Sequence, residues 1–250
     1  MNSYVAITGA SSGIGYEAAK AFASRGENLI LIARRGELLE RLKSEILASF
    51  SSLKIITKIC DLSDVKNVHQ IYDELKIYEI KAWINNAGFG DYSLVGSQNL
   101  AKIERMIDLN IKALTIFSTL FVRDYFNKPA KLINISSAGG YSIVPNAITY
   151  CASKFYVSAF TEGLAYELKA NGAKMQAKVL APAATKTEFG MRATDKSEYD
   201  YDANFKRYHT SAQMAKFLLE LYGSDKCVGL VDRNSFEFKL SEPMFTHVFK

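Results

Sequence analysis

The sequence contains few of the residues that bind metals or cross-link small folds. It has three cysteines and three histidines among 250 residues, and neither set has the spacing of a metal site. The cysteines, Cys60, Cys151 and Cys227, are odd in number and scattered, which argues against a disulfide framework. Cys151 is expected to be a small buried side chain. The sequence therefore predicts no metal and a fold that depends on its hydrophobic core.

Long apolar runs and blocks of like charge are also missing. The longest apolar segment, around residues 111–122, contains Lys112 and is too short to span a bilayer, so no membrane partner is expected. No N-terminal stretch reads as a signal peptide, so a cytoplasmic location is expected by default. The net charge is +5, but the basic residues are dispersed, which argues against nucleic-acid binding. A modest positive charge also suits a phosphate-rich cofactor.

What is present fits one large α/β domain covering residues 1–250. Short apolar runs alternate with amphipathic helical patterns, which predicts a parallel sheet with helices on both faces. The expected strands are Tyr4–Ile7, Asn28–Ala33, Lys54–Ile59, Ala82–Ile84, Lys131–Ile135 and Ala177–Leu180, and the expected helices are Gly13–Arg25, Glu37–Ser49, Val65–Lys76, Leu100–Asp124 and Thr149–Ala170.

The segment 188–209 breaks this alternation because it is polar, rich in tyrosine and without clear periodicity. An irregular insert of this length is usually a functional lid or a mobile loop. Its position after the sixth strand favours a substrate lid. Helical order resumes where Thr210 and Gln213 have the spacing of a capping box.

A glycine-rich turn, TGASSGIG over residues 8–15, joins the first strand to the first helix. Such a turn brings the backbone close to a pyrophosphate, and the free N–H groups of the helix can bind it. The spacing of Gly9, Gly13 and Gly15 differs from the usual Gly-x-Gly-x-x-Gly fingerprint. The strand before the turn and the helix after it predict a nucleotide site.

The end of the second strand indicates which nucleotide is bound. Ala33 stands where an acidic residue usually holds a free ribose hydroxyl, and Arg34 follows it. A guanidinium can bind a 2′-phosphate, which favours NADP(H) over NAD(H). Arg35 is the weaker candidate, and the alternative is that both arginines belong to a solvated helix start. Asp61, after the third strand, is placed to accept a hydrogen bond from adenine, or is an ordinary loop acid.

Tyr150 and Lys154 are four residues apart in a predicted helix and therefore share one face. A neighbouring cation stabilises a phenolate, so the pair can supply an acid or base near neutral pH. The alternative is an ordinary exposed helix face. Ser137 precedes Tyr150 by 13 residues, and the small, amide-rich run Asn85–Gly88 follows the fourth strand as a backbone turn near a cofactor would.

These motifs occur in the order found in the classical short-chain dehydrogenases/reductases (SDR), and the sequence resembles that family, in its NADP-preferring type, from Ser3 to about Thr187. The resemblance implies one doubly wound Rossmann domain with seven strands in the order 3-2-1-4-5-6-7. It also implies an NADP(H)-dependent oxidoreductase that interconverts an alcohol and a ketone or aldehyde by hydride transfer. Helix pairing in the family implies a homodimer or homotetramer.

The resemblance assigns a role to each residue of the predicted catalytic set. Tyr150 would be the general acid/base, and Lys154 would lower its pKa and hold the nicotinamide ribose. Ser137, rather than its neighbour Ser136, would bind the substrate oxygen, and Asn110 would support a water that links Lys154 to solvent. The implied cofactor contacts are Gly9, Ser11, Ser12, Gly13, Ile14, Gly15, Arg34, Arg35, Asp61, Leu62, Asn86, Ala87, Gly88, Tyr150, Lys154, Pro182 and Thr187.

The substrate side of the predicted site is less well defined. Ala183 replaces a glycine that the family usually has after Pro182, with a modest strain cost if the backbone φ is positive there. The pocket would be bordered, by analogy, by Phe89, Ala138, Tyr141, Ile143, Phe189 and Met191, which favours a small, largely apolar carbonyl or alcohol substrate.

Two other functions fit parts of the pattern. One is a catalytically silent, NADP-binding regulatory protein on the same fold, although such a protein is expected to lose the Ser/Tyr/Lys set. The other is a nucleotide-sugar epimerase or dehydratase, which also uses a Tyr-x-x-x-Lys pair. That class has a different glycine spacing and needs a larger C-terminal region than the chain has after Thr187.

Overall fold

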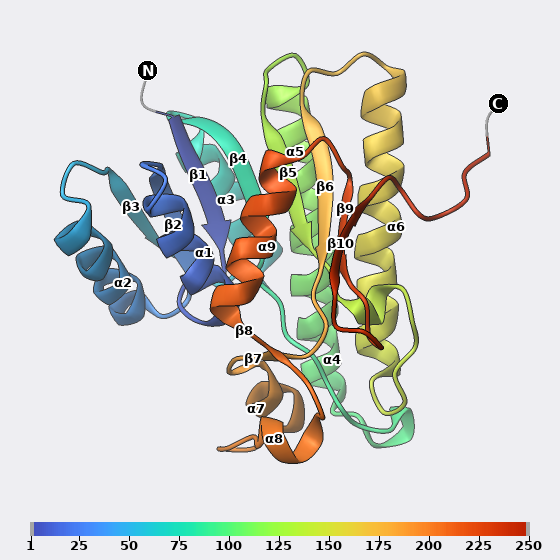
Figure 1. The fold of residues 1–250 in the computed structure, drawn as a ribbon. Coiled ribbons are helices and arrows are strands. Elements are labelled where there is room, and N and C mark those ends of the chain that lie inside the picture. The colour runs from blue at the N-terminus through green and yellow to red at the C-terminus, as the bar shows by residue number, and fades with distance from the viewer. Residues whose placement is uncertain (1–2, 249–250) are drawn as a thin grey trace.

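The computed structural model describes residues 3–248 as a central sheet with helices on both faces (Figure 1). The elements, in chain order, are β1 (Ser3–Thr8), α1 (Gly13–Ala23), β2 (Asn28–Ala33), α2 (Gly36–Ser49), β3 (Ile55–Ile59), α3 (Val65–Leu75), β4 (Glu79–Asn85), η1 (Val95–Ser97), α4 (Leu100–Ile107), η2 (Asp108–Ala113), α5 (Leu114–Tyr125), β5 (Lys131–Ile135), η3 (Ala138–Gly140), α6 (Ile148–Ala170), β6 (Gln176–Ala181), β7 (Thr185–Lys186), α7 (Phe189–Thr194), α8 (Tyr201–Asn204), β8 (His209–Thr210), α9 (Ser211–Gly223), β9 (Val228–Val231) and β10 (Phe238–Ser241).

The sheet has eight strands in the order β3-β2-β1-β4-β5-β6-β9-β10. The first seven are parallel, which confirms the predicted Rossmann order with β9 as the seventh strand. The prediction of seven strands omits β10, which pairs antiparallel with β9 at the edge of the sheet. The connecting turn is closed by the Asp232 carboxylate, which accepts hydrogen bonds from the N–H groups of Asn234 and Ser235.

The core lies in two layers, one on each face of the sheet. Val5 and Ile7 of β1 pack in the layer that includes α1, α2 and α9, while Tyr4 and Ala6 pack in the layer that includes α3, α5 and α6. Trp83 of β4 is fully buried in the second layer. Because both faces of the inner strands are covered, each strand is mostly apolar, and this is the pattern from which the strands were predicted.

The predicted helix Leu100–Asp124 is wrong in one respect, because it is not a single α-helix. A π-helical segment, η2, separates α4 from α5. Asn110 lies inside η2, and its side chain amide donates to the backbone carbonyl of Phe89 (2.9 Å) and to the Ser153 hydroxyl (3.2 Å). Such wide turns in helices are frequent at functional sites.

The segment 188–209 is more ordered than its sequence suggests. It contains α7 and α8, and it ends at β8, which pairs in parallel with β7. Lys102 of α4 holds it through an ion pair with Asp195 (2.8 Å). The capping box that starts α9 at Thr210 and Gln213 is confirmed. Among residues 3–248, no helix is both long and apolar enough to cross a membrane.

Candidate active site

A cavity of about 1560 Å³ lies at the carboxyl ends of the parallel strands. Its walls come from the turns that follow β1, β2, β3, β4, β5 and β6, and from the segment 182–207. In doubly wound sheets ligands bind at this edge, where the strand order reverses between β1 and β4. The cavity is continuous from the glycine turn to Tyr150 and Lys154, so the predicted cofactor and catalytic residues share one site.

The glycine turn is shaped by two close approaches. Gly13 has φ +58°, and a Cβ there would lie 3.1 Å from Cγ2 of Thr187. A Cβ on Gly15 would lie 2.5 Å from both the backbone oxygen of Gly9 and Nδ2 of Asn86. Ser11, Ser12, Gly13 and Ile14 line the cavity, whereas Gly15 packs behind the turn. Gly15 therefore supports the predicted cofactor turn and does not form part of its wall.

Hydrogen bonds connect the turn after β4 to the start of the glycine turn. Thr8 Oγ1 accepts hydrogen bonds from the backbone N–H groups of Asn86 (2.9 Å) and Ala87 (3.0 Å). The Asn86 side chain donates to the backbone oxygen of Thr8 (2.9 Å). Asn86, Ala87 and Gly88 line the cavity, while Asn85 is buried in the sheet and donates to Asn134. Two loops far apart in sequence thus form one rigid wall.

The two arginines after β2 point to different partners. Arg35 donates to the hydroxyls of Ser11 (3.3 Å) and Ser12 (2.8 Å) in the glycine turn. Arg34 instead lies 3.9 Å from the Asp61 carboxylate in an exposed ion pair. Both line the cavity, but Arg35, the weaker candidate by sequence, is the one that contacts the glycine turn.

Asp61 is held by its own loop and by two cations. Its carboxylate accepts hydrogen bonds from the Ser63 hydroxyl (2.7 Å) and backbone N–H (3.1 Å). Burial raises the pKa of Asp61, but the Ser63 hydrogen bonds and the charges of Arg34 and Arg105 outweigh it, so the pKa lies below its ordinary value. Asp61 and the buried Leu62 line the end of the cavity where adenine is expected.

This end of the cavity has donors that can bind the phosphate groups of a nicotinamide dinucleotide. The guanidinium of Arg35 and the hydroxyls of Ser11 and Ser12 face the cavity beside the N-terminus of α1. Helix N-termini and guanidinium groups both bind phosphate oxygens. Pro182 and Thr187 also line the cavity, as the family resemblance implies. The residues present therefore fit the cofactor.

Tyr150 and Lys154 are both buried at the other end of the cavity, with side chains from one face of α6. Lys154 Nζ donates to the backbone oxygen of Ile135 (2.9 Å) and lies 5.9 Å from the centroid of the Tyr150 ring. Burial lowers the pKa of Lys154 to about 8. Burial raises the pKa of Tyr150 above its ordinary value. The interaction with Ser137 acts in the opposite direction but does not cancel this rise. Lys154 is not among the groups that shift the pKa of Tyr150, so the lowering expected from the sequence is not seen here.

The two neighbouring serines differ in direction, as their place on an extended strand end requires. Ser136 is buried and donates to the backbone oxygen of Lys154 (2.9 Å). Ser137 lines the cavity, and its hydroxyl accepts from the backbone N–H of Gly139 (3.0 Å). The structure thus brings Ser137, and not Ser136, to the hydroxyl of Tyr150.

Asn110 lies behind Tyr150 and Lys154 and does not line the cavity. A Cβ on Gly88 would lie 3.0 Å from the Asn110 side-chain oxygen and 3.5 Å from Lys154 Nζ. The same oxygen accepts from the backbone N–H of Phe89 (3.2 Å). Asn110 therefore fixes the loop after β4 next to Lys154.

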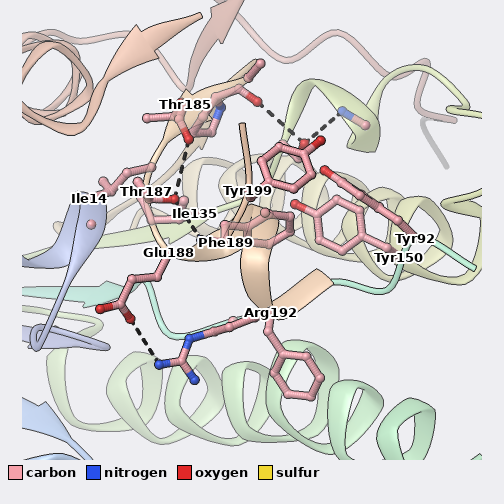
Figure 2. Close-up of a pocket in the computed structure, with 18 of the residues that line it drawn as sticks. Ile14, Tyr92, Ile135, Tyr150, Thr185, Thr187, Glu188, Phe189, Arg192 and Tyr199 are labelled. Atoms are coloured by element: carbon pink, nitrogen blue, oxygen red, sulfur yellow. Dashed lines mark hydrogen bonds and ion pairs between the residues drawn. The ribbon is translucent and has the colours of Figure 1, made fainter. Parts of the chain in front are cut away.

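Aromatic rings form the substrate side of the cavity. Phe189 of α7 packs against Tyr150 (centroids 5.2 Å apart) and Tyr92 (6.1 Å). Figure 2 shows these rings gathered with Tyr199 on one side of the cavity, while Glu188 and Arg192 lie on another. Tyr92 and Tyr199 were missed by sequence reasoning, because single aromatic residues in loops carry no periodic signal. At the rim are the exposed cations Lys206, Arg207 and Arg233, so the cavity is less apolar than expected.

Several predictions for this wall need correction. Phe89, Ala138 and Phe189 line the cavity, but Tyr141, Ile143 and Met191 do not. Tyr141 stacks on Phe245 and donates to Glu162, and Ile143 is 70% exposed. Ala183 lines the cavity without strain: among residues 3–248 the non-glycine positive φ angles are at Asn146, Asp195 and Phe236.

Within residues 3–248 no group of three or more His, Cys, Asp or Glu side chains is placed to hold a metal ion. The cysteines are all free. Cys151 is buried as predicted, and its sulfur accepts a hydrogen bond from the backbone N–H of Val144 (3.4 Å).

Known proteins with the same arrangement identify the family. The model of the short chain dehydrogenase family matches residues 3–198. Sulfoacetaldehyde reductase 2 of Chromohalobacter salexigens is 33% identical over 214 residues, which cover 82% of this chain and 82% of that protein. A short-chain dehydrogenase from Sphingobium yanoikuyae, solved in complex with NADPH, has a TM-score of 0.80 and 28% identity over 90% of this chain and 86% of that one.

A third similar protein is the bulky-bulky ketone specific alcohol dehydrogenase from Comamonas testosteroni. Its structure has a TM-score of 0.75 and 26% identity over 91% of this chain and 86% of that chain. The family match, the fold and the shared cavity agree with one another. The chain belongs to the short-chain dehydrogenase/reductase family, whose members are oxidoreductases acting on CH–OH or C=O groups.

Proposed function

We propose that the protein is an NADP(H)-dependent oxidoreductase that interconverts an alcohol and a ketone or aldehyde. The observation that carries this proposal is the single cavity that joins Arg35, Ser11 and Ser12 at one end to Tyr150 and Lys154 at the other. Phosphate donors and an acid/base pair in one continuous site are what such a reaction requires. The cofactor, when bound, supplies the hydride, so the protein has to bind, orient and move protons.

The reacting carbonyl would lie between Ser137 and Tyr150. Hydride transfer builds negative charge on the carbonyl oxygen, and both hydroxyls can donate hydrogen bonds to it. Tyr150 would then transfer its phenolic proton to that oxygen as a general acid. The Ser137 hydroxyl acts to lower the pKa of Tyr150, so the two groups are close enough to share one substrate oxygen.

Lys154 would stabilise the phenolate that remains on Tyr150. Its ammonium group lies on the same side of α6, and its positive charge would stabilise the negative charge that Tyr150 carries after proton transfer. Asn110 would keep the loop at Phe89 and Gly88 beside Lys154, and so hold open a route for a water that returns the proton. Alcohol oxidation would use the same groups in reverse.

NADP(H) is proposed over NAD(H) because the end of β2 offers two guanidinium groups, on Arg34 and Arg35, and Ala33 offers no acid. The substrate is proposed to place an apolar part against Phe189, Tyr92 and Val144, which line the cavity and pack in one cluster with Tyr150. Residues 188–209 would act as a lid over this part of the cavity. Homodimers or homotetramers are proposed to form through the long helices, as in the family.

An activity screen tests the proposal. Purified protein is given a panel of ketones and aldehydes with NADPH and, separately, with NADH, and nicotinamide absorbance is followed. We expect carbonyl-dependent oxidation of NADPH that exceeds that of NADH. Tight binding of NADPH without turnover on a broad panel would instead favour a regulatory NADP-binding protein.

A further inference from the structure

Arg35 carries a second partner besides the glycine turn. Its guanidinium makes two contacts with the Glu188 carboxylate, Nη1 to Oε1 at 3.1 Å and Nη2 to Oε2 at 2.9 Å. The same Nη2 donates to the Ser12 hydroxyl at 2.8 Å. The guanidinium expected to receive a cofactor phosphate is thus already paired with an internal anion.

The ion pair joins two walls of the cofactor cavity. Arg35 follows β2, whereas Glu188 lies 153 residues later, directly after Thr187 and at the start of α7. Thr187 approaches the glycine turn so closely that a Cβ on Gly13 would lie 3.1 Å from its Cγ2. Glu188 therefore reaches across the turn that supplies the phosphate-binding N–H groups.

We propose that Glu188 is a residue that determines cofactor specificity, because its carboxylate competes with the 2′-phosphate of an adenine nucleotide for Arg35. The proposal rests on the proposed function, since it assumes that a nicotinamide nucleotide occupies the cavity. It makes a separate claim, however. The Glu188 carboxylate lowers the affinity for a nucleotide with a 2′-phosphate and leaves the affinity for a nucleotide with a free 2′-hydroxyl unchanged.

The geometry makes the exchange feasible. The side chains of Arg35 and Glu188 are each 35% exposed, so their ion pair is partly solvated and contributes little to stability. A phosphate monoester has about twice the charge of a carboxylate at neutral pH and three acceptor oxygens. It can therefore displace Glu188 from the guanidinium.

Glu188 has a second cation to which it can remain bound. Arg192, one helical turn along α7, donates to Glu188 Oε2 at 3.0 Å (Figure 2). Release from Arg35 therefore leaves the carboxylate paired. The pKa of Glu188 lies below its ordinary value because Arg35 and Arg192 outweigh the effect of burial, so the competing anion is charged at neutral pH.

The test is the Glu188→Gln variant, which keeps the size of the side chain and removes its charge. Dissociation constants for NADPH, NADH and adenosine 2′,5′-bisphosphate are measured by calorimetry at low salt. We expect affinity for NADPH and for the bisphosphate to rise roughly three- to fivefold, with a change in NADH affinity of less than about 1.5-fold. Equal changes for NADPH and NADH, or weaker binding of NADPH, would overturn the proposal.

Two controls separate competition for Arg35 from other effects. Glu198→Gln removes an exposed acid that lines the same cavity and has no ion pair within residues 3–248, so the ratio of NADPH to NADH affinity should stay unchanged. In an Arg35→Gln background, Glu188→Gln should change NADPH affinity by less than about 1.5-fold, because the contested cation is gone. An effect of Glu188→Gln that persists in that background would show general charge repulsion and overturn the proposal.

Further measurements distinguish a failure of this proposal from misfolding of a variant and from a failure of the proposed function. Melting temperatures without nucleotide show whether each variant is folded before binding is measured. Wild-type protein that binds neither nucleotide would defeat the proposed function itself. Wild-type protein that binds both, with a ratio that Glu188→Gln leaves unchanged, would defeat only the role given to Glu188.

Discussion

The two ends of the cavity hold their charged groups in opposite ways. At the reacting end, Lys154 and Tyr150 are 5% and 8% exposed, and Lys154 is fixed by a backbone carbonyl. At the phosphate end, the side chains of Arg35 and Glu188 are each 35% exposed and are held by one another. The reacting end is thus built to keep one geometry, whereas the phosphate end can exchange one anion for another. Substitutions should therefore act on rate at one end and on nucleotide affinity at the other.

The largest effect is expected from Tyr150→Phe, which removes the proposed acid and keeps the ring. The value of kcat/KM for carbonyl reduction should fall by roughly 10²- to 10⁴-fold, because the proposed proton donor is gone. The dissociation constant for NADPH should stay within about twofold of wild type. Steady-state rates and calorimetry measure the two quantities.

Tyr156→Phe is the matched control for this variant. Tyr156 lies on the same helix, but its hydroxyl is paired with Thr115 (2.9 Å) and its side chain is partly exposed away from the cavity. Its loss should leave kcat/KM nearly unchanged. A Tyr150→Phe enzyme that retains more than a tenth of wild-type activity would contradict the claim that the Tyr150 end of the cavity determines the rate.

Ser137→Ala should have the next largest effect, since it removes one donor to the developing negative charge. A loss of roughly 10²-fold in kcat is expected, with little change in the free energy of unfolding. Ser136→Ala sharpens the comparison, because Ser136 is bonded inside the core to Lys154 and Ser158. That variant should lose about 1–3 kcal/mol of stability and keep the activity of its folded fraction. The reverse pattern would mean that the two serines are wrongly assigned.

Arg35→Gln should act on affinity alone. Loss of a charged hydrogen-bond donor to phosphate typically costs about 1.5–3 kcal/mol, so the dissociation constant for NADPH should rise roughly 10- to 100-fold. At saturating NADPH, kcat should stay close to wild type. Arg34→Gln should weaken NADPH binding less, because Arg34 faces Asp61 and not the glycine turn. A larger effect from Arg34 would place the 2′-phosphate on the Asp61 side.

The smallest expected effect is a dependence of reduction on pH. Burial lowers the pKa of Lys154 to about 8, so the ammonium loses its proton as the pH rises through that value. The neutral amine cannot stabilise the Tyr150 phenolate. The value of kcat/KM for reduction should be level below pH 7 and fall by about tenfold between pH 7 and pH 9. A flat profile across this range would show that the charge of Lys154 is not needed.

Much of the scaffold could be predicted because its signals are local. The ranges of β2 and β5 match their apolar runs, since both faces of these strands are covered and most of their residues are apolar. The glycine turn and the Tyr150–Lys154 spacing are likewise short motifs. The structure places both sets around one cavity, as the sequence predicts.

The parts that escaped prediction depend on contacts far apart in sequence. The π-helical segment at Asn110 accompanies hydrogen bonds to Phe89 and Ser153, 21 and 43 residues away. Arg35, and not Arg34, turns to the glycine turn, where Glu188 also holds it. Tyr141 leaves the expected pocket wall because Glu162 and Phe245 bind it elsewhere. Short sequence patterns cannot predict these contacts, because the two partners of each contact lie far apart along the chain.

Transfer of a labelled hydride tests the central claim most directly. Reduced NADP carrying deuterium at C4 of the nicotinamide is incubated with the protein and a carbonyl compound that the activity screen has identified. Mass spectrometry then measures deuterium at the new carbinol carbon. We predict one deuterium per molecule of product when the label is on the transferred face, and a roughly 10²- to 10⁴-fold lower rate of labelled product with Tyr150→Phe. Product formed without deuterium from either face would contradict hydride transfer in this cavity.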